Sequence, residues 1–300
     1  MIRKDRSAYV ELVCRSCFSF LEGASHPEEL VDRAVALGLR GLAITDRDGV
    51  YGVVRAYRRL KEIVDEGGVD PERFQLLVGS RISVESFPPL VLIAKNKKGY
   101  GQLCALISRG RQRAPKGECF LNIDDLPDFT EGLIALLLDT HPEDQVGHRE
   151  NTLTYVSLAR QIYGSELFLG ISRQLHPASE RRLRRMISAS NSLSIPSVAV
   201  GDVLYHQPGR QVLQDIIRCI QLGCTVEEAG KKLEPNGEAY LRSSEEMMRL
   251  FADIPRAVER SLEIAERCSF SLGSLSYAYP SELIPGGISA MERLRALVEE

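Results

Sequence analysis

The segment GLAITDRDGVYGVVRAYRRLKEIV, residues 41–64, decides the fold. Gly41–Thr45 is apolar or small and predicts a buried strand, whereas Gly52–Val64 predicts a helix. The polar loop between them contains Asp46 and Arg47. An aspartate at the end of a strand suits a metal ligand or a general base. The arginine beside it is always protonated and offers only hydrogen-bond donors, so it cannot bind a cation.

The same order of strand and helix continues along the chain to Val200. It predicts an α/β fold with a mostly parallel sheet or barrel, in which residues after the strand ends meet at one face. Four polar residues fall just beyond the ends of predicted strands, namely Asp46, Arg81, Arg173 and Asp202. The other strands are predicted at Tyr9–Cys14, Gln75–Val78, Ile82–Val84, Leu90–Ala94, Gly132–Leu138, Leu167–Ile171 and Ser197–Val200.

The pattern changes after Tyr205. His206–Cys219 and Ser243–Cys268 have only helical spacing, and Pro255 is expected to break or kink the second of these segments. The stretch SYAYPSELIPGGIS, residues 276–289, is typical of a connector. A helix that starts at Ala290 and has no cap favours a fragment of a longer chain. We therefore expect three parts: a barrel, a helical segment, and a connector that leads into a further region, at residues 1–207, 208–275 and 276–300.

Composition excludes several classes of protein. The 300 residues carry a net charge of −3, which argues against a domain that binds nucleic acid over its whole surface, although a local basic patch remains possible. No apolar run reaches the roughly 18 residues that a membrane span needs. No signal peptide is apparent at the amino terminus, and seven irregularly spaced cysteines fit a reducing cytoplasm better than a disulfide framework.

Four long blocks of the chain resemble, in the same order, the polymerase-and-histidinol-phosphatase (PHP) region of bacterial C-family DNA polymerases. The likeness is to the error-prone paralogues of the DNA polymerase III alpha subunit. The blocks are ELVCRSCFSFLEGASHPEELVDRAVALGLRGLAITDRDGVYGVVRAYRRLKE (11–62), LVLIAKNKKGYGQLCALIS (90–108), SIPSVAVGDVLYHQPGRQVLQDIIRCIQLGCTVEEAG (194–230) and YLRSSEEMMRLFADIPRAVERSLEIAERCSFSL (240–272).

The resemblance implies a distorted (β/α)7 barrel followed by a small helical segment. Active members of the family hold up to three metal ions on His, Asp and Glu ligands and hydrolyse phosphoesters. This chain keeps Asp46 and Asp202 at two of the nine ligand positions that can be carried over. His206 survives beside one lost ligand but is not itself an expected ligand. The other seven positions are occupied by Val13, Arg15, Arg47, Arg81, Pro89, Gln174 and Leu204.

These replacements predict a degenerate site that holds no metal. Without metal, Asp46 and Asp202 would be left as like charges in a partly buried cleft, at a cost of several kcal/mol. Arg15, Arg47 and Arg81 each replace a ligand and supply positive charge. Our hypothesis is that the three arginines form salt bridges to the two aspartates, so that the cleft is a structural ion-pair network.

The sequence therefore predicts a non-catalytic PHP module of an error-prone DNA polymerase that acts in replication and damage-induced synthesis. The module would support the palm and thumb of the same parent chain, and DNA and the sliding clamp would be partners of the parent enzyme. No cofactor is expected in this segment, and Mg²⁺ only in the absent palm. Two alternatives stay open: a metal-dependent phosphoesterase or 3′–5′ exonuclease, and a free-standing degenerate PHP protein whose arginines hold an anion.

A basic stripe and a cysteine pair have both a functional and an ordinary interpretation. The stripe on one predicted helix could contact a phosphate backbone, but such a run is more often a solvated face. Cys14 and Cys17 form a C-x-x-C pair without a second pair at zinc-site spacing, which favours two unrelated cysteines. The stripe consists of Arg181, Arg182, Arg184 and Arg185.

Overall fold

The computed structural model describes residues 9–139, 148–276 and 288–299. Within these ranges seven strands form one sheet whose spatial order is the order of the chain. β4 is antiparallel to β3 and β5, and the other neighbours are parallel. The strands are β1 (Val10–Glu11), β2 (Gly41–Ile44), β3 (Gln75–Ile82), β4 (Leu90–Ala94), β5 (Leu133–Leu138), β6 (Leu167–Ile171) and β7 (Ser197–Ala199).

The two edges of the sheet meet just beyond β1 and β7. The amide of Arg15 donates to the carbonyl of Val203 over 3.0 Å, and the amide of Val203 donates to the carbonyl of Val13 over 2.9 Å. These bonds curl the sheet toward a closed barrel. The α/β fold class and the distorted seven-stranded barrel predicted from the sequence are thereby confirmed.

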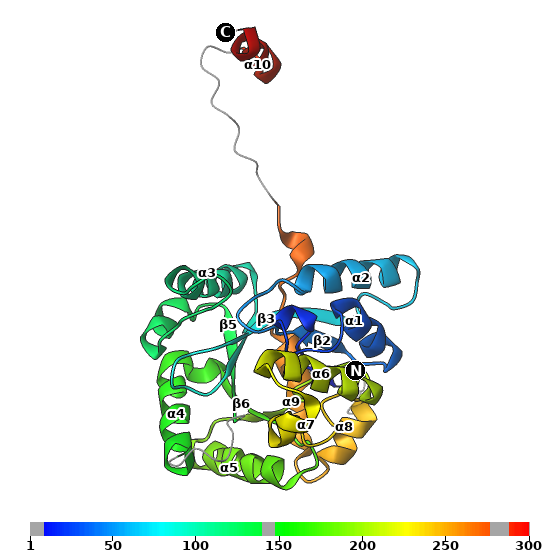
Figure 1. Cartoon of the computed structure of the whole chain (residues 1–300), viewed down its shortest axis with the longest axis vertical. Helices are drawn as coiled ribbons and strands as arrows, with labels where there is room; N and C mark the ends of the chain where they lie inside the picture. Colours follow the sequence, from blue (N-terminus) through cyan, green and yellow to red (C-terminus); the bar gives the residue numbers. More distant parts are fainter. Residues whose placement is uncertain (1–8, 140–147, 277–287, 300) are drawn as a thin grey trace, which may run out of the picture.

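Helices surround the strands, with α3, α4 and α5 on one side and α1 and α2 on the other (Figure 1). Alternate residues of each strand face these helices or the interior of the curl. In β4, for example, Leu90 and Leu92 pack with the helices, whereas Val91 and Ile93 point inward. The helices of the barrel are α1 (Pro27–Ala36), α2 (Val53–Asp65), α3 (Lys97–Arg113), α4 (His148–Tyr163) and α5 (Pro177–Leu193).

The helical segment after the barrel shares the barrel's core. Ile264 and Ala265, near the end of α9, and Cys268, just after it, pack with the inward-facing strand residues. Val10 in β1 donates its amide to the hydroxyl of Ser261 in α9 over 3.1 Å. The predicted break at Pro255 is confirmed, because α9 begins there. The remaining helices are α6 (Gln211–Leu222), α7 (Val226–Ala229), α8 (Ser244–Leu250), α9 (Pro255–Glu266) and α10 (Ala290–Glu299).

One predicted break in the sheet is wrong. Gln75–Val78 and Ile82–Val84 were expected as two strands, but Gln75–Ile82 is continuous. The reason is the antiparallel pairing with β4, which aligns Arg81 with Val91 and extends the ladder past the expected end. Arg81 therefore lies inside β3 and not beyond it. No helix of the described residues is long and apolar enough to cross a membrane.

Candidate functional site

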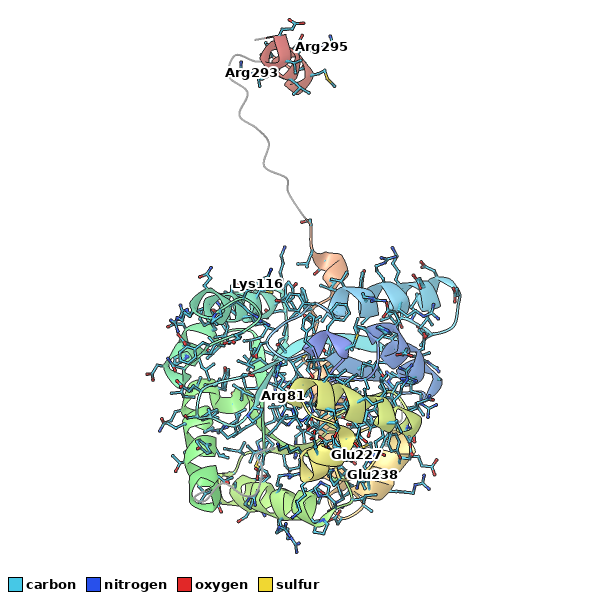
Figure 2. All side chains as sticks on the ribbon, in the orientation of Figure 1. Arg81, Lys116, Glu227, Glu238, Arg293 and Arg295 are labelled. Atoms are coloured by element: carbon cyan, nitrogen blue, oxygen red, sulfur yellow. The ribbon has the colours of Figure 1, made fainter. Side chains whose placement is uncertain are left out.

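The candidate site lies at the end of the barrel where β1, β2 and β7 finish. Arg15 follows β1, Asp46 follows β2, and Asp202 follows β7, while Arg81 comes from the last part of β3. Figure 2 places Arg81 toward the middle of the view, inside the ring of helices. Asp46 and Asp202 are buried, with 0% and 6% of their surface exposed. Parallel strands thus bring residues that are distant in the chain into one buried polar cluster.

Two arginines share the carboxylate of Asp202. Arg15 Nη2 lies 2.9 Å and Arg81 Nη1 lies 3.1 Å from the same oxygen, Oδ1. Only 12% and 11% of the two arginine side chains are exposed, so water screens these pairs weakly. Burial acts to raise the pKa of Asp202, but the two guanidinium groups outweigh it and hold the pKa below its usual value. Asp202 is therefore a carboxylate at neutral pH.

Arg81 experiences two opposing effects. Its burial, followed by repulsion from Arg15, lowers the pKa of its guanidinium to about 10, although Asp202 and Glu22 counteract this shift. A pKa of about 10 still leaves Arg81 protonated at pH 7. The cluster consequently contains two cations close together, which are held by the carboxylates between them.

Glu22 is a member of the site that sequence reasoning missed. Arg15 Nη1 lies 3.3 Å from Glu22 Oε2, and Arg47 Nη1 lies 2.5 Å from Glu22 Oε1. Glu22 thus links the arginine that follows β1 to the arginine of the quoted loop. The available signal was a charge mismatch, since three arginines faced two aspartates and required a further acid.

Asp46 contradicts part of the predicted network. Its carboxylate accepts hydrogen bonds from the amide of Ser16 over 2.7 Å and from the hydroxyls of Ser16 and Ser19 over 2.9 and 2.8 Å. In the described part of the chain no arginine forms an ion pair with it. The physical reason is the short 3₁₀ helix η1 (Cys17–Ser19), which folds over the carboxylate and covers it with serine side chains.

Burial raises the pKa of Asp46 above its usual value, although the bonds from Ser19 and Ser16 oppose the shift. The close fit extends to the start of α2. A Cβ on Gly52 would lie 2.5 Å from Asp46 Oδ2 and 2.8 Å from Ser16 Oγ. Only glycine leaves room there for the aspartate and its serine partner.

His206 and Gln174 are used in other contacts. His206 Nδ1 lies 2.7 Å from the hydroxyl of Ser25, and the amide of His206 donates to that hydroxyl over 2.9 Å. The carbonyl of Gln174 accepts a bond from the Asn236 side chain over 2.8 Å. Both contacts join the barrel to neighbouring loops.

Arg173 is a predicted strand-end residue that does not join the cluster. Its guanidinium pairs with Asp253 over 2.9 Å and with Glu180 over 3.0 Å, and it therefore ties the end of β6 to the turn before α9. The basic stripe on α5 is also partly engaged, because Arg185 pairs with Asp139 over 3.0 Å. These contacts favour structural roles for both features.

The residues present do not fit a divalent metal ion. Val13, Pro89 and Leu204 have no donor atoms in their side chains, and arginine has no lone pair to offer. Among the described residues, no three His, Cys, Asp or Glu side chains form a group that could hold a metal.

Comparisons with known proteins identify relatives for nearly the whole chain. A model of the PHP domain family matches residues 11–168. An error-prone DNA polymerase from Rhodopirellula baltica is 38% identical over 299 residues, which cover 97% of this chain and 25% of that protein. An error-prone DNA polymerase from Pseudomonas aeruginosa is 40% identical over 295 residues, covering 98% of this chain and 27% of its own. The chain thus spans about a quarter of the length of these curated relatives.

Solved structures are more distant. A putative metal-dependent phosphoesterase from Bifidobacterium adolescentis is 14% identical, with a TM-score of 0.46 over 65% of this chain and 87% of that one. An amidohydrolase from Chromobacterium violaceum, solved with sulfate and no metal, has the same identity and TM-score, over 66% and 88%.

Proposed function

Because the chain belongs to the PHP domain family, we propose that it is the non-catalytic PHP module of an error-prone DNA polymerase. In this proposal an arginine–carboxylate network has taken the place of the family's metal centre. The parent enzyme adds nucleotides to a primer in the cytoplasm during replication and damage tolerance. Its palm, which lies outside this chain, uses Mg²⁺ and deoxynucleotides, and the module packs against the palm and thumb.

The observation that carries the proposal is the pair of guanidinium groups on Asp202. Arg15 and Arg81 stand at positions where the resemblance implies metal ligands, and both donate to one buried carboxylate oxygen. In a low-dielectric site, a carboxylate without a partner would be strongly destabilising. The arginines supply the positive charge that metal ions would otherwise provide, and they do so without a Lewis acid or an activated water.

Serine donors provide the second support. Asp46 is held by Ser16 and Ser19, so its lone pairs are directed at hydroxyls and an amide. This arrangement satisfies the buried carboxylate with protein donors and stabilises the end of the barrel.

The first test combines metal analysis with a hydrolysis assay on the purified chain. We expect no stoichiometric Zn, Mn or Fe, and no hydrolysis of bis(p-nitrophenyl) phosphate above the buffer rate after incubation with Zn²⁺ or Mn²⁺. A metal-dependent phosphoesterase serves as the positive control. Stoichiometric metal together with hydrolysis would favour the phosphoesterase alternative and overturn the proposal.

The second test uses a full-length error-prone polymerase that carries this chain as its PHP region. Removal of metals with EDTA, followed by addition of Mg²⁺ alone, is expected to restore primer extension completely, because no metal supports this module. Failure of Mg²⁺ alone, with rescue by Zn²⁺ or Mn²⁺, would contradict the structural role assigned to the arginines. A purified chain that is fully stable by itself and does not associate with a polymerase core would favour the free-standing alternative.

A further inference from the structure

A groove of about 1030 Å³ lies beside the candidate site. Its walls are η1 and the residue after it, the loop that follows β2, and the segment that follows α3. The lining includes three aromatic rings and three cationic side chains, a combination that the ion-pair network does not explain. These residues are Phe18, Phe20, Tyr51, Arg47, Arg111 and Lys116.

The groove presents aromatic rings to solvent. Phe20 is 63% exposed and Tyr51 is 50% exposed. Phe20 has a φ of 43° and the next residue, Leu21, a φ of 61°, which are left-handed values that bulky residues rarely adopt. Such strain persists where the surroundings impose it, and it occurs often at binding sites. The backbone is therefore held in an unfavourable conformation that displays a ring to solvent.

The anchor of this loop is Asp46. Ser16, which caps the start of η1, and Ser19, its last residue, donate to the buried carboxylate of Asp46. The amide of Arg47 donates to the hydroxyl of Ser19 over 3.1 Å. Asp46, which stands at one of the family's ligand positions, thus fixes the loop that carries Phe20. A ring fixed in this way loses little conformational freedom when a flat ligand stacks on it.

The opposite wall is tied together by Arg111. Its guanidinium donates to the carbonyls of Asp48 over 2.8 Å and Gly117 over 2.9 Å, which holds the loop after β2 against the segment after α3. Lys116 is exposed on this wall, and Figure 2 shows it at the edge of the molecule beside α3. The segment that carries Lys116 is therefore held at a fixed position across the groove from Phe20.

Positive charge exceeds negative charge in the groove. Its lining has three cations against two carboxylates, Asp48 and Glu118. Asp48 is 6% exposed, and its carboxylate accepts the amide of Ser83 over 2.7 Å, so its charge is turned into the protein. Arg47 pairs with Glu22 yet keeps 38% of its side chain exposed. A ligand in the groove therefore meets cationic groups beside aromatic faces.

We propose that this groove binds single-stranded nucleic acid, with bases stacked on Phe20 and Tyr51 and phosphates near Arg47 and Lys116. Single-strand binding sites combine aromatic platforms with cations that follow the backbone. A small anion would leave the rings unused, and a duplex would keep its bases stacked on one another. The net charge of −3 permits such binding only at a local patch, and the groove is one.

The experiment measures fluorescence anisotropy of a labelled oligothymidylate with the purified chain at low and moderate salt. Phe20→Ala and Tyr51→Ala should each weaken binding about fivefold or more, which corresponds to at least about 1 kcal/mol per stacked base. The matched control is Ile220→Ala on α6, because Ile220 is also 63% exposed. It should leave the affinity unchanged.

A second pair of variants tests the cation. Lys116→Ala should lower the affinity and reduce the salt dependence by about one counterion. Lys231→Ala removes an exposed lysine of a different segment and should do neither. Binding measured on this chain does not depend on polymerase activity, so its failure would leave the proposed function standing.

Phe20→Gly separates binding from folding. Glycine adopts positive φ readily, so the Phe20→Gly variant should unfold at a urea concentration no lower than the wild type does. It should bind the oligothymidylate as weakly as Phe20→Ala. Undetectable binding by the wild type at low salt would overturn the proposal. Unchanged binding of the oligothymidylate by both ring variants would also overturn it.

Discussion

Arg81 Nη1 lies 3.1 Å from Asp202 Oδ1, although 121 residues separate the two in the chain. Arg81 comes from β3 and Asp202 follows β7, so the contact crosses the end of the curled sheet. Asp202 has a φ of 49°, a left-handed conformation that aspartate tolerates better than most residues. The pair therefore depends on the closure of the barrel, and its loss should be measurable as a loss of folding stability.

Replacing Arg81 with methionine should destabilise the protein by about 1–3 kcal/mol, because the buried carboxylate of Asp202 would keep Arg15 but lose one of its two charged donors. Urea unfolding followed by circular dichroism measures this change. Arg55→Met is the control. Arg55 also pairs with a carboxylate, that of Glu28, but half of the Arg55 side chain is exposed, so the loss should stay below about 1 kcal/mol. Equal losses for the two variants would contradict a buried network at Asp202.

Removing the Ser19 hydroxyl, which donates to Asp46, should cost more folding stability than removing the Arg47 side chain. Ser19→Ala removes a hydroxyl that donates to a buried carboxylate and should cost about 1–3 kcal/mol. Arg47→Ala removes a partly exposed partner of Glu22 and should cost less than about 1 kcal/mol. Chemical denaturation of both variants gives the comparison. A larger loss for Arg47→Ala would restore the arginine–Asp46 pairing that the sequence predicted.

Part of this site could be predicted from the sequence and part could not. Asp202, Arg15 and Arg81 could be placed together because each follows or ends a strand of a barrel whose order the alternating pattern predicts. Ser16, Ser19 and Glu22 lie in and around the short 3₁₀ helix η1, where side-chain direction depends on backbone angles that no periodicity of the sequence indicates. The assignment of Asp46 to the arginines was wrong for this reason.

The fold was predicted more completely than the contacts of its last segment. Most strands are short apolar runs that are buried along their whole length, so their positions follow from the sequence. The packing of Ile264 and Ala265 of α9 inside the curl does not, because an amphipathic helix indicates that one face is buried but not against which partner. Long-range contacts of this kind require the three-dimensional arrangement.

Glu11 predicts a pH dependence of stability. It is 1% exposed and accepts bonds from the Tyr9 hydroxyl over 2.8 Å and the Val13 amide over 2.9 Å. Burial raises its pKa from 4.5 to about 7, against the effect of these bonds. Between these two values the folded state holds a proton that the unfolded state has released. The free energy of unfolding should therefore fall as the pH rises through this window, by about 3 kcal/mol from this group, and then level off.

The Glu11→Gln variant tests whether Glu11 causes this pH dependence of stability. Glutamine keeps the shape and an accepting oxygen, and the Tyr9 hydroxyl can accept a bond from its amide group. The variant should match the wild type near pH 5 and exceed its stability near pH 8, as measured by urea unfolding across this range. Parallel curves for the two proteins would assign the pH dependence to other groups.

Gly52→Ala should destabilise the end of the barrel through a steric clash. Gly52 has a φ of −70°, which alanine adopts without strain, so backbone conformation does not require glycine here. The requirement comes from space, because the added Cβ would lie 2.5 Å from Asp46 Oδ2 and would displace the carboxylate from its serine donors. We expect a loss of about 1–3 kcal/mol, typical of overpacking in a filled core.

Gly101→Ala in α3 is the matched control, since nothing lies within 4 Å of its Cβ position, and it should stabilise the protein by about 0.5–1 kcal/mol. A neutral Gly52→Ala would show that Asp46 can move, and it would remove the basis for treating that carboxylate as a fixed anchor of the loop that carries Phe20.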